Sequence, residues 1–194
     1  MTPNIQPTQE ALWHELISDA EKSSDQRLED DLKSYLVCLL MRFLKKPDMI
    51  SGAIALEYLN NFLEFGEIRK NGLRDIGDKC LIFSGFFPKQ TRKRRVSADY
   101  FISIGQSAYL GLSEEFEKNN AQGLSDLYML ASRKFITMAT ILMSAKMLNE
   151  EEEFIDPLLS HELWERTHSP FFKKKLKKWS ESSMFFLDNN SVKH

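Results

Sequence analysis

LRDIGDKCLIFSGFFPKQTRKRRVSADYFISIGQSAYLGL, residues Leu73–Leu112, is the stretch of sequence that indicates the fold class most directly. Its first part, Leu73–Phe87, places apolar residues in alternating steps of three and four, the spacing of one face of an α-helix. Pro88 ends this helix, because proline lacks the backbone N–H that would continue the helical hydrogen bonds. A second, almost uncharged helix is expected over Tyr100–Leu112. Two apolar helices joined by a basic connection therefore predict an all-α fold.

Helical spacing continues through most of the chain. Two further apolar helices are expected over Leu28–Leu44 and Leu127–Leu148, and another helix is expected to begin near Asp48 and to end near Gly66. Eight glycines and six prolines in 194 residues are too few for the many turns of an all-β fold. We therefore predict a single-domain helical bundle of six to eight helices. Its expected regions are a flexible N-terminus, a helical domain and a flexible C-terminal tail, over residues 1–7, 8–180 and 181–194.

Composition and charge argue against several classes of protein. The net charge of −2 argues against a general nucleic-acid binder. Cys38 and Cys80 each stand among apolar neighbours, so we expect two buried thiols in a reducing compartment. The longest uncharged stretches, Tyr100–Ser113 and Phe135–Ala145, fall short of the roughly 18–20 residues of a membrane span. The N-terminus lacks the apolar core of a signal peptide, so we expect a cytoplasmic protein without a transmembrane segment.

Two basic clusters are the strongest charge signals in the chain. Each is a run of cations with no acidic residue inside it. A solvated charged surface, docking of an acidic protein or peptide, and binding of nucleic acid or an anionic membrane are all compatible with this pattern, although no helix-turn-helix is recognisable. The candidate partner-binding residues are Lys89, Arg92, Lys93, Arg94 and Arg95 in the first cluster, and Lys173, Lys174, Lys177 and Lys178 in the second.

The second cluster belongs to an expected amphipathic helix, Phe171–Trp179. Pro170 suits the first turn of a helix, because the donor it lacks is not needed there. Phe172, Leu176 and Trp179 recur at i, i+4 and i+7, which is one narrow stripe. We predict that this stripe docks on the body of the protein while the lysines face water.

Four short segments carry a resemblance to a known family. They are Leu73-Arg74-Asp75-Ile76-Gly77-Asp78, Ser84-Gly85-Phe86-Phe87, Val96-Ser97 with Tyr100, and Gly105 with Ala108-Tyr109. In this order they resemble a family of uncharacterised proteobacterial helical proteins. The resemblance implies a bacterial source and a helical fold, and it assigns no activity and no catalytic residues. The connection between the two helices is more basic here than in that family.

The sequence lacks the familiar motifs of catalytic and metal centres. A single Glu165-x-x-His168 pair does not make the paired motif of a two-metal helical bundle, and the cysteine spacing fits no zinc site. No nucleophile elbow and no glycine-rich phosphate loop occurs. Asp78, beside Gly77, is either a buried carboxylate with a shifted pKa or a partner for Arg74 one turn earlier. We predict no catalytic residue, no metal ligand and no cofactor.

These observations favour a non-enzymatic helical interaction or regulatory protein. It would dock a partner, expected to be an acidic protein or peptide, through the basic connection and an apolar groove. One alternative is a nucleic-acid-associated protein that uses both basic clusters. The other is a carrier or enzyme with a buried apolar ligand pocket. Its candidate lining residues are the aromatics Phe83, Phe86, Tyr100 and Tyr109.

Overall fold

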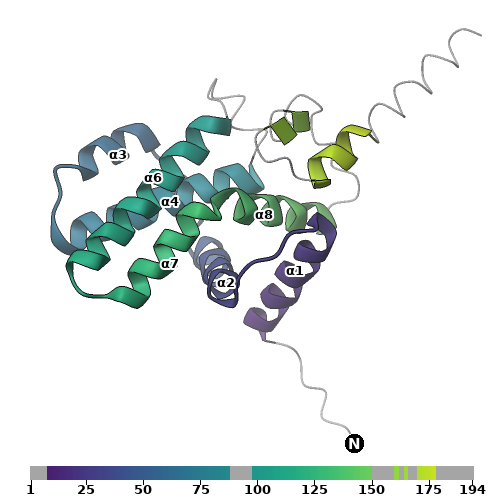
Figure 1. The fold of residues 1–194 in the computed structure, drawn as a ribbon, viewed down its shortest axis with the longest axis horizontal. Coiled ribbons are helices and arrows are strands. Elements are labelled where there is room, and N and C mark those ends of the chain that lie inside the picture. Colours follow the sequence, from purple (N-terminus) through teal and green to yellow (C-terminus); the bar gives the residue numbers. More distant parts are fainter. Residues whose placement is uncertain (1–7, 88–97, 150–159, 162–163, 166–169, 178–194) are drawn as a thin grey trace, which may run out of the picture.

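The computed structural model describes residues 8–87, 98–149, 160–161, 164–165 and 170–177, and the regular structure in these ranges is entirely helical (Figure 1). The all-α prediction is confirmed. The helices with defined bounds are α1 (Gln9–Ser24), α2 (Asp30–Lys45), the 3-10 helix η1 (Pro47–Ile50), α3 (Ile54–Asn61), α4 (Gly66–Phe86), α6 (Ala98–Lys118), α7 (Gln122–Arg133) and α8 (Phe135–Asn149).

Helix α4 is the central element of the bundle. It packs against α3, α6 and α8, and Figure 1 shows it behind α6 in the middle of the ribbon. Its buried side chains include Leu73, Ile76, Cys80 and Phe83, spaced by three and four residues as the sequence indicated. Helix α1 packs against α2 and α8, and α2 packs against α7, so the core is closed on its other side.

Helices α4 and α6 approach closely at Gly77. The ring of Tyr109, on α6, lies against this glycine where the Cβ of any other residue would stand. On α6, Gly105 and Ala108 are also buried, and Gly105 lies against the ring of Phe135. Small residues therefore set the distance between the helices, because a larger side chain at these positions would push them apart.

The prediction of one continuous helix over Leu127–Leu148 is wrong. The chain forms two helices, α7 and α8, which meet at Lys134, where φ is −95° and ψ is 11°. Near the end of α7, Ser132 Oγ donates to the carbonyl of Gln106 at 2.8 Å, and Gln106 Nε2 donates to the carbonyl of Ser132 at 3.4 Å. The second bond satisfies one of the carbonyls that a helix end leaves without a partner. The break lets α7 follow α6 while α8 turns toward α1 and α4.

The segment between α2 and α4 also differs from the expectation. In place of one helix from Asp48 to Gly66, the chain forms the short η1 and then a separate helix α3. Gly66 does not stop a helix. It is the first residue of α4 and has a φ of +58°, a left-handed conformation that glycine adopts without strain. The consequence is a sharp turn between α3 and α4 that places the two helices against each other.

The two cysteines have different surroundings. Cys80 is buried as predicted, whereas Cys38 is exposed. Helix α2 buries Leu36, Val37, Leu39 and Leu40, and Cys38 points away from this stripe. Apolar neighbours in the sequence therefore predicted the environment of Cys38 wrongly, because one helical turn carries both a buried and an exposed side.

Replacing Gly77 with alanine is expected to destabilise the protein by about 1–3 kcal/mol, the usual cost of overfilling a packed core. The added methyl group would collide with the ring of Tyr109. This cost outweighs the gain in helix propensity, about 1 kcal/mol for alanine over glycine. Chemical denaturation measures the change.

Gly123→Ala in α7 is the matched control, because nothing lies within 4 Å of its added Cβ. Its stability is expected to be unchanged or slightly higher. If Gly77→Ala were as harmless as this control, α4 and α6 would not be in the contact described above.

Candidate functional site

A buried carboxylate, Asp78, lies where α2, α4 and α6 meet. It is 1% exposed. One of its oxygens forms an ion pair with the guanidinium of Arg42 from α2. The other, Oδ1, accepts hydrogen bonds from the hydroxyl of Tyr35 at 2.5 Å and from that of Tyr109 at 2.7 Å. These contacts join three helices through one side chain.

Burying a carboxylate is costly unless it is paired and hydrogen-bonded, and Asp78 meets both conditions. The expected partner, Arg74, is the wrong one. Its Nε lies 3.9 Å from Asp75 Oδ1, and its Nη2 donates to Asn71 Oδ1 at 3.2 Å. Arg74 stays on the outer side of α4, whereas Asp78 points inward and is reached by Arg42. Asp78 is therefore a buried carboxylate, the other interpretation that its apolar neighbours allowed.

The hydroxyls that reach Asp78 belong to a cluster of three tyrosine rings. Tyr35 packs edge-on against Tyr109 and Tyr128, with ring centroids 6.0 and 5.7 Å apart. Burial raises the pKa of Tyr109. Burial and then the neighbouring Tyr109 hold the pKa of Tyr35 well above its usual value. Both hydroxyls therefore keep their protons and act as donors.

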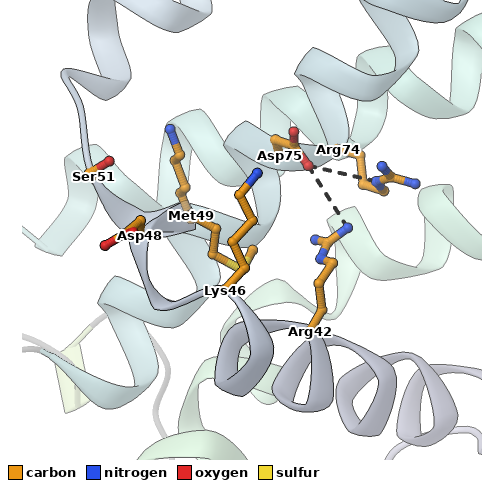
Figure 2. Close-up of a pocket in the computed structure, with 8 residues that line it drawn as sticks. Arg42, Lys46, Asp48, Met49, Ser51, Arg74 and Asp75 are labelled. Atoms are coloured by element: carbon orange, nitrogen blue, oxygen red, sulfur yellow. Dashed lines mark ion pairs between the residues drawn. The ribbon is translucent and has the colours of Figure 1, made fainter.

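An open pocket of about 520 Å³ lies beside this network, between α2, η1 and α4. Figure 2 shows Arg42 extending from α2 toward Asp75, and a second ion pair that joins Asp75 to Arg74 of the same helix, α4. Both ion-pair distances to Asp75 Oδ1 are 3.9 Å. The lining side chains are the cations Arg42, Lys46, Arg74 and Lys79, the acids Asp48 and Asp75, and Ser51 and Met49. Cations therefore outnumber acids among the lining side chains, and the surface that these side chains expose to the pocket is mostly apolar.

Large apolar side chains are exposed on α3, on the turn into α4 and on the first turn of α4. Figure 1 shows α3 at the end of the molecule away from α1. Leu63 and Phe65 are 76% and 81% exposed. The sequence predicts a helix from near Asp48 to near Gly66 here, but the spacing of its apolar residues does not show that they are left exposed to water. The set consists of Leu56, Leu59, Phe62, Leu63, Phe65 and Ile68, and we call it the α3 surface.

Acids stand beside the α3 surface, and the two nearby cations, Lys70 and Arg69, each pair with an acid; the guanidinium of Arg69 also lies over the ring of Phe62. Glu67 is exposed, and Glu64 is partly exposed and forms no ion pair with another described residue. Lys70 is buried and pairs with Glu67. Arg69 Nε bonds to Glu115 Oε1 of α6 at 3.2 Å. The α3 surface therefore combines apolar side chains with a negative edge.

The first basic cluster, Lys89 with residues 92–95, lies outside the described residues, as does Lys178. The role predicted for these residues stays a prediction. His168 also lies outside the described residues, so the Glu-x-x-His pair is not described as a whole.

The described part of the second cluster lies on the helical residues 170–177. Of the predicted docking stripe, Phe172 is buried, Leu176 is half-buried and Trp179 lies outside the described residues, while the neighbouring Phe171 is also buried. Lys173, Lys174 and Lys177 are exposed. A solvated charged surface would expose these lysines in the same way, so their role as a binding site stays a prediction.

Three of the four aromatics predicted to line an apolar pocket belong to two separate ring clusters. Phe83 packs against Phe101, with ring centroids 5.3 Å apart, and Tyr100 touches the same ring. Tyr109 belongs to the tyrosine cluster beside Asp78, and Phe86 is half-buried. None of the four lines the pocket between α2, η1 and α4. A pocket around these aromatics stays a prediction.

Within the described ranges, no group of three or more histidine, cysteine, aspartate or glutamate side chains is arranged to hold a metal ion. In the same ranges, no helix has the length and apolar character to cross a membrane. Comparisons of the chain with models of protein families, with curated proteins and with solved structures find no match.

High pH is expected to destabilise the protein through the tyrosines beside Asp78. The pKa of Tyr109 and that of Tyr35 are raised in the folded state, whereas an unfolded tyrosine titrates near pH 10. Above about pH 10 the folded state binds more protons than the unfolded state, so stability falls as pH rises; below it, this contribution is fully present.

Thermal melting at increasing pH, together with phenolate absorbance, measures this effect. The absorbance of these phenolates is expected to appear together with unfolding, and Tyr109→Phe is expected to flatten the fall in melting temperature. Ionisation of all tyrosines near their ordinary pKa in a protein that stays folded would contradict the buried network.

Proposed function

We propose that this chain is a non-enzymatic interaction protein that docks a helical partner on the α3 surface. The observation that carries the proposal is the exposure of six large apolar side chains on one short part of the chain. Folded proteins rarely leave a contiguous apolar patch in water unless it serves an interaction. Docking would remove this area from water, and burial of apolar area is the main driving force of association.

The chemistry around the α3 surface favours an amphipathic partner helix with lysine or arginine beside its apolar stripe. Leu56 and Leu59 lie one turn apart on α3, and Leu63 follows in the turn after α3, so the three form a row against which the apolar side chains of another helix can pack. Glu64 and Glu67 stand beside the row and attract cations. Self-association fits less well, because a two-fold contact would bring the same acids together.

Docking of an acidic protein or peptide on the basic clusters is a separate proposal that rests on charge alone. The exposure of Lys173, Lys174 and Lys177 supports it. We prefer the α3 surface as the main docking site. Apolar burial supplies binding free energy, whereas exposed charges chiefly set the association rate and the orientation.

Two synthetic helical peptides of about 15 residues test the proposal. Both carry leucine at i, i+3, i+4 and i+7, and the flanking positions hold lysine in one peptide and glutamate in the other. Calorimetric titration is expected to show the lysine peptide binding at least about tenfold more tightly, because Glu64 and Glu67 attract it and repel the other. Equal affinities, or no binding of either peptide, would refute the proposed partner chemistry.

Substitutions on the surface give the matched comparison. Leu63→Ser and Phe65→Ser are each expected to weaken binding of the lysine peptide about tenfold. Their stability should change by less than about 0.5 kcal/mol, because both side chains are exposed. Leu12→Ser is the control, since Leu12 is an exposed leucine on α1, and it should bind as the unchanged protein does. A dimer that Leu63→Ser dissociates would show that a second copy covers this surface, contrary to the proposal.

A further inference from the structure

We propose that the pocket between α2, η1 and α4 binds a small polar organic anion, whose carboxylate or phosphate group lies at the arginine end. The pocket volume of about 520 Å³ falls within the range of roughly 300–1,000 Å³ typical of small-molecule sites. It contains no residue of the α3 surface. The inference therefore stands independently of the proposed docking function.

The charged groups of the lining favour an anionic ligand. Met49 is the single apolar side chain among the residues that form the pocket. Four cations and two acids make the lining positive. Three of these cations have other partners: Arg42 pairs with Asp78, Lys79 pairs with Glu57 of α3, and Arg74 Nη2 donates to Asn71 Oδ1 at 3.2 Å. Lys46, and Arg74 with its 3.9 Å ion pair to Asp75, are the side chains best able to contact an anion.

The internal ion pairs of the two arginines inside the pocket are weak. Both contacts with Asp75 are 3.9 Å long, whereas a direct charge-assisted hydrogen bond measures about 2.7–2.9 Å. Asp75 is also 54% exposed, so water competes for it. The Nε atoms of Arg42 and Arg74 are buried and have no hydrogen-bond acceptor among the described residues. Arg74 therefore gains a strong bond when it turns toward a carboxylate or phosphate and gives up only a weak ion pair, whereas Arg42 stays paired with Asp78.

The side of the pocket opposite the arginines can bind the part of the ligand that carries no charge. Asp48 and Ser51 lie across the pocket from the arginines in Figure 2, with Lys46 between the two sides. Asp48 is an acceptor, and Ser51 both donates and accepts, so they match hydroxyl groups on a ligand. Lys46 is exposed and forms no ion pair with another described residue. A ligand with an anionic group at one end and hydroxyl groups along the rest could therefore bind to both sides of the pocket.

Binding is tested by calorimetry with four probes that separate these features. Glucose 6-phosphate and gluconate carry similar hydroxyls with a phosphate or a carboxylate, glucose lacks the charge, and inorganic phosphate lacks the body. At least one of the two organic anions is expected to bind with a dissociation constant of about 1 mM or below. Inorganic phosphate should bind more weakly than the better of them, and glucose more weakly still. The stronger of the two organic anions identifies the head group that the arginines prefer.

Variants locate the binding in the pocket. Arg74→Gln and Lys46→Gln are each expected to weaken the better anion about tenfold, the effect of one lost charge-assisted hydrogen bond. Lys45→Gln is the matched control, because Lys45 is an exposed lysine beside Lys46 that does not line the pocket. It should weaken binding by less than about twofold. Arg42 is left unchanged, because it also holds Asp78.

Three results would overturn the inference. The first is no binding of either organic anion or of phosphate at about 10 mM. The second is glucose binding as tightly as the organic anions. The third is equal weakening by Lys45→Gln and by the two pocket variants, which would mean a general attraction to the basic surface. Melting temperatures of all variants show whether each is folded. If only one of the two pocket variants is folded, comparing that variant with Lys45→Gln is enough.

Discussion

The pairing of Asp78 with Arg42, supported by the hydroxyls of Tyr35 and Tyr109, is the interaction on which the arrangement of the helices depends. A carboxylate that is 1% exposed has few alternatives to these partners, because leaving it unpaired would cost far more than a surface ion pair contributes. Apolar side chains can pack in several ways, whereas these polar groups meet in one. They therefore fix how α2, α4 and α6 are placed relative to one another.

Helix α4 carries three different environments on its sides. Asp78 points into the core, Arg74 and Asp75 line the pocket, and Ile68 belongs to the α3 surface. The close approach at Gly77 holds this helix against α6. Arg42 lines the pocket and also pairs with Asp78, so the pocket shares one side chain with the buried network, whereas the α3 surface contains none of its residues.

The sequence pattern predicted the helical class and the buried positions of α4, because periodicity near 3.6 residues depends on the local chain alone. It did not predict the break at Lys134, which depends on bonds between Ser132 and Gln106 of another helix. It also named the wrong partner for Asp78, because Tyr35 is 43 residues away and Arg42 lies on the same distant helix. The α3 surface escaped prediction for a similar reason. An apolar stripe reveals a preferred side of a helix, and the tertiary structure decides whether another element covers it.

A double-mutant cycle on Arg42 and Asp78 is the most direct test of this account. Arg42→Gln and Asp78→Asn keep the approximate shape of each side chain and remove its charge, and chemical denaturation gives the free energy of unfolding of the single and double variants. The account predicts that the two changes are coupled by at least about 1 kcal/mol, because residues in direct contact are not additive. Effects that add to within about 0.3–0.5 kcal/mol, as independent sites do, would show that the buried pair does not hold the helices together.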